Sequence, residues 1–286
     1  MDPGRRLLAC LVMALLAPTG LFAEEQGAPV LDVVKLKPSA EGVVPAAVEA
    51  AKLGEADKLV LTNLDVISDK QMDEPTKKSA FDRIVGLDDA AIPRLATVLK
   101  DGNARFDQRW VSARALGRIG GKPATKILRS TLQTDRFSMV RLAAIQALKD
   151  LNDPGSYEDF LKCLSDEALV VRSAAADALG TLGDARAVDP LTKALNREDN
   201  YYKGRSLWVR RHIVAALGAI ESRSSVKTLI KALDDPDPMV TREAVSALER
   251  VTKVTFRVPA STEDERISRT MPKWKSWWEE NKKDYL

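Results

Sequence analysis

The sequence predicts an all-α fold in which pairs of helices stack side by side as an α-solenoid. Three observations predict this fold: an Ala-Leu pair recurs at near-constant steps, the apolar residues between its copies have helical spacing, and the composition is that of a globular protein. The chain is 45% hydrophobic and 30% charged, which argues against disorder. Its formal charge of +3 is spread along the chain, so no basic block indicates a nucleic-acid partner.

The N-terminus has the features of a secretory signal peptide. Arg5 and Arg6 precede an apolar run from Leu7 to Ala17, and a small residue, Ala23, stands where a peptidase would cleave. The run is shorter than the ~20 residues that a bilayer span requires. The sequence therefore predicts a signal peptide over residues 1–23, an exported bacterial protein that is periplasmic or secreted, and no membrane span after cleavage.

Three expectations concern the chain after the predicted cleavage site. Cys163 would be the only remaining thiol, and its apolar neighbours favour a buried side chain over a reactive one. Residues 24–43 mix proline, glycine and charge without a period, which predicts a linker. Residues 44–73 are predicted to form an N-terminal capping region that is helical from Pro45 to Ile67.

A repeat of about 31 residues is predicted to cover residues 74–256, with a weaker first copy centred on Ile84. The steps between the five marker pairs are 32, 31, 38 and 31 residues. The pairs are Ala115-Leu116, Ala147-Leu148, Ala178-Leu179, Ala216-Leu217 and Ala247-Leu248. In each copy a first segment rich in small residues precedes a second segment with leucines four apart, as in Leu191 and Leu195, so each unit is predicted to be a helix pair.

These features resemble the HEAT-repeat family, in particular its bacterial PBS-lyase HEAT-like form. The pattern D-x-x-x-x-V-R-x-x-A-A-x-A-L-G-x-L-G-D of that form is met by Asp166 to Asp184. The resemblance implies a solenoid in which each repeat touches only its neighbours, with the second helices lining the concave surface. Alanine at the marker position would let successive helices approach closely.

The C-terminal region is predicted to close the stack. Residues 257–271 are expected to be a loop, and residues 272–286 a Trp-rich capping helix opened by Pro272. Trp274, Trp277 and Trp278 would share one face of this helix. We interpret that face as a lid over the last repeat, and a glycan-binding aromatic platform is the alternative.

The sequence offers no constellation for catalysis. His212 is the only histidine, and it neighbours arginines rather than an obvious carboxylate. A histidine-rich metal site, a phosphate-binding glycine loop and a Cys-x-x-Cys pair are all missing from the sequence. We therefore predict no catalytic residue, no metal, no cofactor and no enzymatic activity.

Two columns of cations recur with the repeat. Arg109, Arg141, Arg172 and Arg210 each stand seven residues before a marker leucine. Arg141 and Arg172 each follow an aspartate by six residues, which predicts N-caps and a structural ladder of arginines paired with acids at the repeat junctions. The second column contains Lys162, Lys193 and Lys231, in the last turn of the second helices. These lysines would form a basic stripe on the concave face, or they simply favour the helix C-terminus.

One joint of the repeat is longer than the others. The step from Leu195 to Val209 is fourteen residues, against seven from Leu164 to Val171. Insertions in solenoids often serve recognition, and this one, residues 196–208, contributes aromatic and basic side chains. A tolerated insertion whose aromatics fold back on the stack is the alternative. The candidate partner-binding residues here are Tyr201, Tyr202, Lys203, Arg205, Trp208, Arg211 and His212.

The sequence therefore predicts an exported, non-enzymatic scaffold that binds a protein or peptide partner through its concave face and residues 196–208. The positive charges of this insertion would steer an acidic partner. A lyase-type enzyme related to the phycobilin lyases is the first alternative, implied by the family resemblance. Binding of a nucleic-acid backbone is the second alternative, which export and the shortness of the basic stripe disfavour, so no nucleic acid is expected.

Overall fold

The structure is a computed structural model that describes residues 46–285, with side chains from residue 54 onward. The predicted signal peptide over 1–23 and the predicted linker over 24–43 lie outside the described residues. The described part of the chain begins with α2 (Ala46–Ser68), which occupies most of the predicted N-terminal capping region. None of the described helices is both long enough and apolar enough to span a membrane.

Helix pairs follow α2 along the chain, as the repeat predicts. The first helices of the pairs are α3 (Glu74–Val85), α5 (Phe106–Ile119), α7 (Ser138–Asp150), α9 (Leu169–Leu182), α11 (Val209–Ala219) and α13 (Pro238–Thr252). The second helices are α4 (Ile92–Lys100), α6 (Gly121–Thr134), α8 (Tyr157–Cys163), α10 (Val188–Leu195) and α12 (Val226–Ala232). Short 3-10 turns lead into α4, α8, α10 and α12, at Asp88–Ala91, Pro154–Ser156, Ala185–Ala187 and Arg223–Ser225. Two further 3-10 turns lie at Glu198–Asn200, in the long joint, and Lys282–Asp284, at the C-terminal end.

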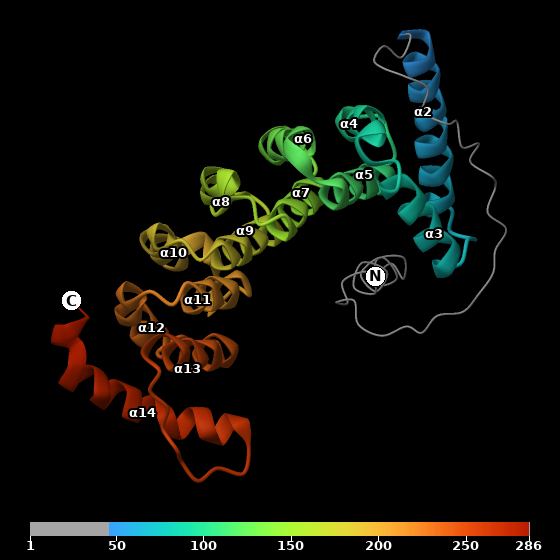
Figure 1. Cartoon of the computed structure of the whole chain (residues 1–286). Helices are drawn as coiled ribbons and strands as arrows, with labels where there is room; N and C mark the ends of the chain where they lie inside the picture. The colour runs from blue at the N-terminus through green and yellow to red at the C-terminus, as the bar shows by residue number, and fades with distance from the viewer. Residues whose placement is uncertain (1–45, 286) are drawn as a thin grey trace. The chain divides into compact units, whose positions relative to one another are not determined.

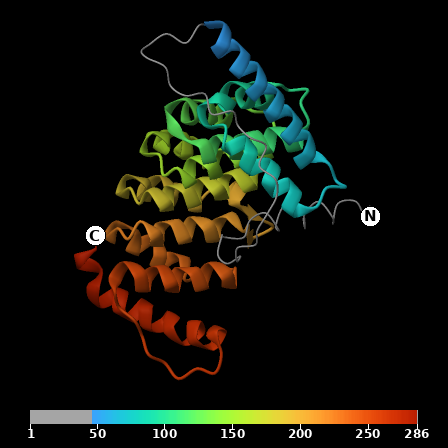
Figure 2. The same ribbon diagram turned by 45° about the vertical axis from the view of Figure 1, so that its right-hand side comes forward.

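The first helices from α5 to α13 form one row and the second helices form another. Each of these first helices packs on the next first helix, and each second helix packs on the first helix that follows it. Figure 1 shows the two rows, and Figure 2 shows the successive first helices side by side. The buried leucines of the second helices, such as Leu128 and Leu191, lie between the rows and form a continuous core with the first helices.

Small residues let the first helices approach closely. A Cβ added at Gly117 would lie 2.5 Å from the Cβ of Ala147, and one added at Gly218 would lie 2.6 Å from the Cβ of Ala247. At Gly180 an added Cβ would lie 2.9 Å from the Cα of Ala216. Side chains of normal size would force these backbones apart, because close-packed interiors tolerate little extra volume.

This close approach corrects the expected order of the two rows. In the repeats from α5 to α13, the first helices follow the inside of the bend and the second helices follow the outside (Figure 1). The expectation that the second helices line the concave surface is therefore wrong. The physical reason is that small residues let successive first helices lie close together. The row of first helices is therefore the shorter one, and the shorter row lies on the inside of a bend. We call the solvent side of the first helices the inner face.

The C-terminal helix, α14 (Glu263–Asn281), covers the last repeat and packs on α12 and α13. Trp274 is fully buried, and its ring centroid lies 4.9 Å from that of Phe256 and 5.4 Å from that of Trp277. Trp277 and Trp278 are partly buried against the same core. The aromatic face of α14 is thus used for packing, as a lid requires.

This helix starts earlier than predicted, so residues 263–271 are helical rather than loop. Thr262 is the N-cap, and its hydroxyl accepts a hydrogen bond from the amide of Glu265 at 3.2 Å. The Glu265 carboxylate in turn accepts from the amide of Ser261 at 2.7 Å. A cap with these reciprocal bonds fixes the helix start, and Pro272 then lies inside the helix instead of opening it.

Candidate functional site

The arginine column is a set of buried joints between repeats. Arg141 donates two hydrogen bonds to the carboxylate of Asp166, at 2.8 and 2.6 Å, and Arg210 donates two to Asp235, at 3.0 and 2.5 Å. Arg109 donates one hydrogen bond to Asp135 and another to the Leu99 carbonyl at 3.0 Å. These three arginines are at most 7% exposed. The interpretation as a structural ladder is confirmed, since each pair connects one first helix to the turn before the next.

The aspartates of these pairs are not N-caps, contrary to the expectation. The N-cap residues of α7 and α9 are Phe137 and Ala168, and neither caps with its side chain. The carboxylates of Asp135 and Asp166 instead accept from the backbone amides of these two residues, at 2.9 and 2.8 Å. The turn therefore aims each carboxylate at the arginine of the preceding repeat.

Arg172 is the exception in this ladder. It is 4% exposed, yet no carboxylate of the described residues lies within 4.0 Å of its guanidinium group. It donates to the backbone oxygens of Asp166 at 2.7 Å, Glu167 at 3.3 Å and Asp199 at 3.1 Å. Residues 196–208 account for this, because the position six before Arg210 is Gly204 instead of an aspartate.

The insertion contains a β-hairpin, which the sequence analysis did not predict. Strands β1 (Tyr201–Tyr202) and β2 (Arg205–Ser206) pair with Tyr201 opposite Ser206 and Tyr202 opposite Arg205. Lys203 and Gly204 form the two-residue loop and both have positive φ, of 50° and 74°. Positive φ at both positions is what the favoured two-residue hairpin turn requires.

One half of the hairpin is fastened to the stack. The Tyr201 ring lies 4.0 Å from the guanidinium carbon of the buried Arg210. The Ser206 hydroxyl donates to Asp235 at 2.5 Å, so it shares the carboxylate that Arg210 binds. Asn200 is fully buried and donates to the Ala194 carbonyl at 2.7 Å. For Tyr201, the interpretation that the aromatics fold back on the stack is confirmed.

The other half of the hairpin faces solvent. Tyr202 is 62% exposed, more than any other large hydrophobic side chain of the described residues. The Lys203 amine lies 5.4 Å from the centre of its ring, and Arg205 is its exposed cross-strand neighbour. Strand alternation explains the division, because paired residues point to the same side and the next pair points to the other.

The inner face at α9 and α11 joins Trp208, His212 and Asp177. The Nδ1 atom of His212 lies 2.9 and 3.0 Å from the two carboxylate oxygens of Asp177, on the neighbouring first helix. The Trp208 and His212 rings meet edge to face, with centroids 5.3 Å apart. Trp208 is 45% exposed. The histidine therefore has a carboxylate partner on the preceding first helix that sequence reasoning missed.

Arg211 extends this region into the first turn of α11. Its side chain is exposed and makes no ion pair within 4.0 Å among the described residues. Trp208, Arg211 and His212 thus come together at one end of α11, next to the hairpin. The structure brings the seven candidate residues of the insertion and α11 into two groups: Tyr201, which is fastened, and the others, which are fully or partly accessible.

The lysine column lies elsewhere. Lys162, Lys193 and Lys231 are exposed and belong to α8, α10 and α12, which form the outer row. The expected basic stripe on the concave face is therefore wrong, because the second helices are on the outside of the bend. Each lysine stands in the last turn of its helix, where a cation complements the helix dipole.

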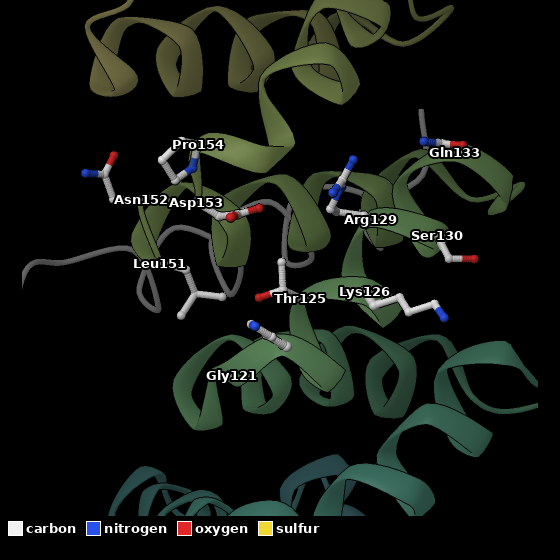
Figure 3. Close-up of a pocket in the computed structure, with 11 residues that line it drawn as sticks. Gly121, Thr125, Lys126, Arg129, Ser130, Gln133, Leu151, Asn152, Asp153 and Pro154 are labelled. Carbon is white, nitrogen blue, oxygen red and sulfur yellow. The ribbon is translucent and has the colours of Figure 1, made fainter.

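An open groove of ≈ 700 Å³ lies between α6 and the turn that precedes α8 (Figure 3). Lys126, Arg129 and Asp153 are among its lining residues, and none of the sequence-predicted site residues lines it. Arg129 donates to the buried carboxylate of Asp159 at 2.5 Å. This groove is therefore bounded by groups that already stabilise the α6–α8 contact.

The described residues contain no group of three or more side chains that could hold a metal ion. Burial raises the pKa of the Cys163 thiol to about 12, and the nearby carboxylates of Asp166 and Asp159 act in the same direction. At neutral pH this thiol stays protonated, which is the state of a structural cysteine. The buried interpretation of Cys163 is confirmed.

Comparison with protein families matches the description "HEAT repeats" three times, over residues 67–149, 125–208 and 203–261. Together these matches cover more than half of the chain and include α3 to α13. A comparison with curated proteins finds no match.

Three solved structures illustrate what this chain is similar to. YibA of Escherichia coli is 19% identical over 76% of this chain and 80% of its own, with a TM-score of 0.50. An engineered protein is 24% identical over 70% of this chain and 97% of its own, with a TM-score of 0.44. The complex of CpcE and CpcF of phycocyanin lyase from a Nostoc species is 18% identical over 86% of this chain and 100% of its own, with a TM-score of 0.32. At this identity, the likeness to YibA shows the fold alone.

Proposed function

We propose that this chain, which belongs to the HEAT-repeat family, is an exported scaffold without catalytic activity that binds a protein or peptide partner. The binding surface is the inner face around α9 and α11 together with the outward half of the hairpin. The observation that carries this proposal is Trp208, a large aromatic side chain that is 45% exposed at the start of α11.

Exposed tryptophan and tyrosine side chains support partner binding on physical grounds. Burial of a large exposed aromatic side chain against a partner lowers the free energy of the complex, and such residues contribute most of the binding energy in many interfaces. Trp208 is also held from behind by His212, which Asp177 orients. An anchor that is already ordered loses little conformational entropy when a partner covers it.

Site-specific photo-crosslinking in the native host tests this proposal. A photoreactive phenylalanine analogue at Trp208 is expected to give a discrete crosslinked product with one protein. The same analogue at Lys193, an exposed residue of the outer row, serves as the matched control and is expected to give none. Identical products from both positions would contradict the proposal.

Substitution tests the same surface without a crosslinker. Tyr202→Ala combined with Trp208→Ala is expected to abolish binding of the crosslinked protein while the helical circular dichroism stays unchanged. Tyr201 is left intact because it packs on Arg210. Binding that survives the double substitution would remove the hairpin and Trp208 from the account.

Export belongs to the same proposal and rests on residues 1–23. Expression of the full chain in a bacterium, followed by fractionation and N-terminal sequencing, is expected to give an envelope protein that begins at Glu24. A cytoplasmic protein that retains Met1 would contradict export.

A further inference from the structure

The insertion divides its charged side chains into two kinds. At the base of the hairpin, Arg197 donates two hydrogen bonds to the Asp199 carboxylate, at 2.9 and 2.6 Å. Lys203 and Arg205 in the outward half make no ion pair within 4.0 Å among the described residues, and neither does Arg211. The base therefore uses its charges internally, whereas the three outward cations have their binding capacity free.

The three cations also flank exposed aromatic rings. Tyr202 has Lys203 on its ring and Arg205 opposite it in the strand pair, while Arg211 follows Trp208 by three residues. The methylene groups of an Asp or Glu side chain could contact an aromatic ring while its carboxylate binds one of the cations. Against these three cations the insertion has one exposed acid without an ion pair, Glu198, so the net charge of the unpaired groups is positive.

The hairpin presents these groups in a fixed geometry. Its turn has the positive φ values of a two-residue hairpin loop, and its inward half is held by Arg210, Asp235 and Asn200. A recognition element that is rigid before binding loses less entropy on binding than a mobile loop. Guanidinium and ammonium groups in such an element favour carboxylates, through charge-assisted hydrogen bonds.

We infer that the outward half of the hairpin and the first turn of α11 dock an acidic segment of a partner protein, with carboxylates on Lys203, Arg205 and Arg211. This inference rests on the proposed function and names the chemistry of its partner. The cations are few and interleaved with aromatic rings, which fits a short run of Asp and Glu with apolar neighbours better than the continuous charge of a nucleic-acid backbone.

Defined peptides test the inference with the purified chain. The probe is a fluorescein-labelled peptide of about 12 residues that combines Glu, Ser and Leu, long enough when extended to span about 40 Å. Its counterpart has Gln at every Glu position. Fluorescence anisotropy is expected to show tighter binding of the Glu peptide and a loss of that advantage when salt is raised from about 50 mM to about 300 mM.

Two matched triple variants locate the site. The first variant combines Lys203→Gln, Arg205→Gln and Arg211→Gln. It is expected to bind the Glu peptide about tenfold more weakly, because each exposed charge pair contributes about twofold to the affinity. Lys162→Gln, Lys193→Gln and Lys231→Gln remove the same charge from the outer row and are expected to change binding less than about twofold.

Three results would overturn the inference: equal losses in the two triple variants, equal binding of the Glu and Gln peptides, or tighter binding of single-stranded DNA with the same dependence on the hairpin cations. None of them would affect the crosslinking result at Trp208, so failure of the acidic-partner inference is distinguishable from failure of the proposed function. The circular dichroism spectra of both triple variants are expected to match that of the wild type, because all six substituted side chains are exposed.

Discussion

The α7–α9 and α9–α11 junctions each contain a buried arginine at the same repeat position, and the two arginines bind different groups. At the first, Arg141 donates hydrogen bonds to the carboxylate of Asp166, and these bonds raise the pKa of the guanidinium group. At the second, Arg172 is equally buried and donates only to backbone oxygens. The joint that leads into α11 is seven residues longer, and those residues replace the expected aspartate by a hairpin.

A repeat junction can therefore dispense with its ion pair when other contacts hold the helices together. The α9 and α11 helices still approach closely at Gly180 and Ala216. The hairpin is fastened to the following junction, through Ser206 and Asp235. The α9–α11 junction therefore carries a hairpin where the regular junctions carry the carboxylate of an ion pair.

The largest expected effect separates the two arginines directly. Arg141→Met leaves the Asp166 carboxylate buried without its partner and is expected to reduce the free energy of unfolding by about 3–5 kcal/mol. Arg172→Met removes hydrogen bonds to carbonyl groups only and is expected to cost about 1–2 kcal/mol. Urea denaturation of both variants measures the difference, and equal losses would contradict the comparison.

The next effect tests a close contact of first helices that the α5–α7 and α9–α11 junctions share. Gly117→Leu and Gly180→Leu are each expected to destabilise the fold by about 1–3 kcal/mol, because the added side chain would overlap the neighbouring first helix. Gly54→Leu is the matched control, since an added Cβ there meets nothing within 4 Å. A tolerated leucine at Gly180 alone would mean that the insertion loosens the α9–α11 contact.

A smaller effect concerns acid stability at the base of the insertion. Hydrogen bonds from Arg197 lower the pKa of Asp199, so its contribution to stability is present above its unfolded pKa of about 4 and is lost as pH falls through the folded pKa. Asp199→Asn is expected to cost at most about 1 kcal/mol near neutral pH, because the pair is half exposed, and to cost less as the pH falls through the folded pKa.

Asp184 provides the control for this pH dependence, since Arg186 lowers its pKa through the same kind of hydrogen bond in a regular repeat. Thermal unfolding of Asp199→Asn and Asp184→Asn between about pH 2 and pH 6 should show the same direction. A wild-type advantage that grows on acidification would contradict the assignment of the Arg197–Asp199 pair.

The smallest effect is a change of reactivity without a change of fold. Because burial raises the pKa of Cys163 to about 12, a thiol reagent near pH 8 is expected to label it only when the structure opens locally. Arg141→Met is expected to speed labelling more than Arg172→Met does, because it destabilises the structure more and so makes local opening around Cys163 more frequent. Fast labelling of the wild-type chain would contradict the buried environment.

Much of the fold follows from residue spacing. The marker alanines predict close helix contacts, and the arginine column predicts buried joints, because residues that recur in every repeat serve what every repeat shares. The order of the two rows was mispredicted, since spacing identifies helix pairs without showing toward which helix the stack bends. The start of α14 was missed because Pro272 is a familiar helix opener, although Thr262 and Glu265 have the spacing of a capping box.

The candidate site could be predicted only in part. The irregular length and composition of residues 196–208 identified the place, because an insertion interrupts the repeat. Its division into a fastened and an exposed half depends on the pairing register of Tyr201 with Ser206, which a four-residue strand pair does not reveal in sequence. The partner of His212 was missed because Asp177 stands 35 residues away in the preceding repeat.

One measurement tests most directly whether the insertion serves recognition rather than stability. Replacing residues 196–208 by the regular joint sequence of residues 165–170 restores an aspartate six positions before Arg210 and so offers Arg172 a carboxylate. The free energy of unfolding of this variant, measured in urea, is expected to equal or exceed that of the wild type. A loss of more than about 2 kcal/mol would show that the hairpin holds the stack together, and would contradict this expectation.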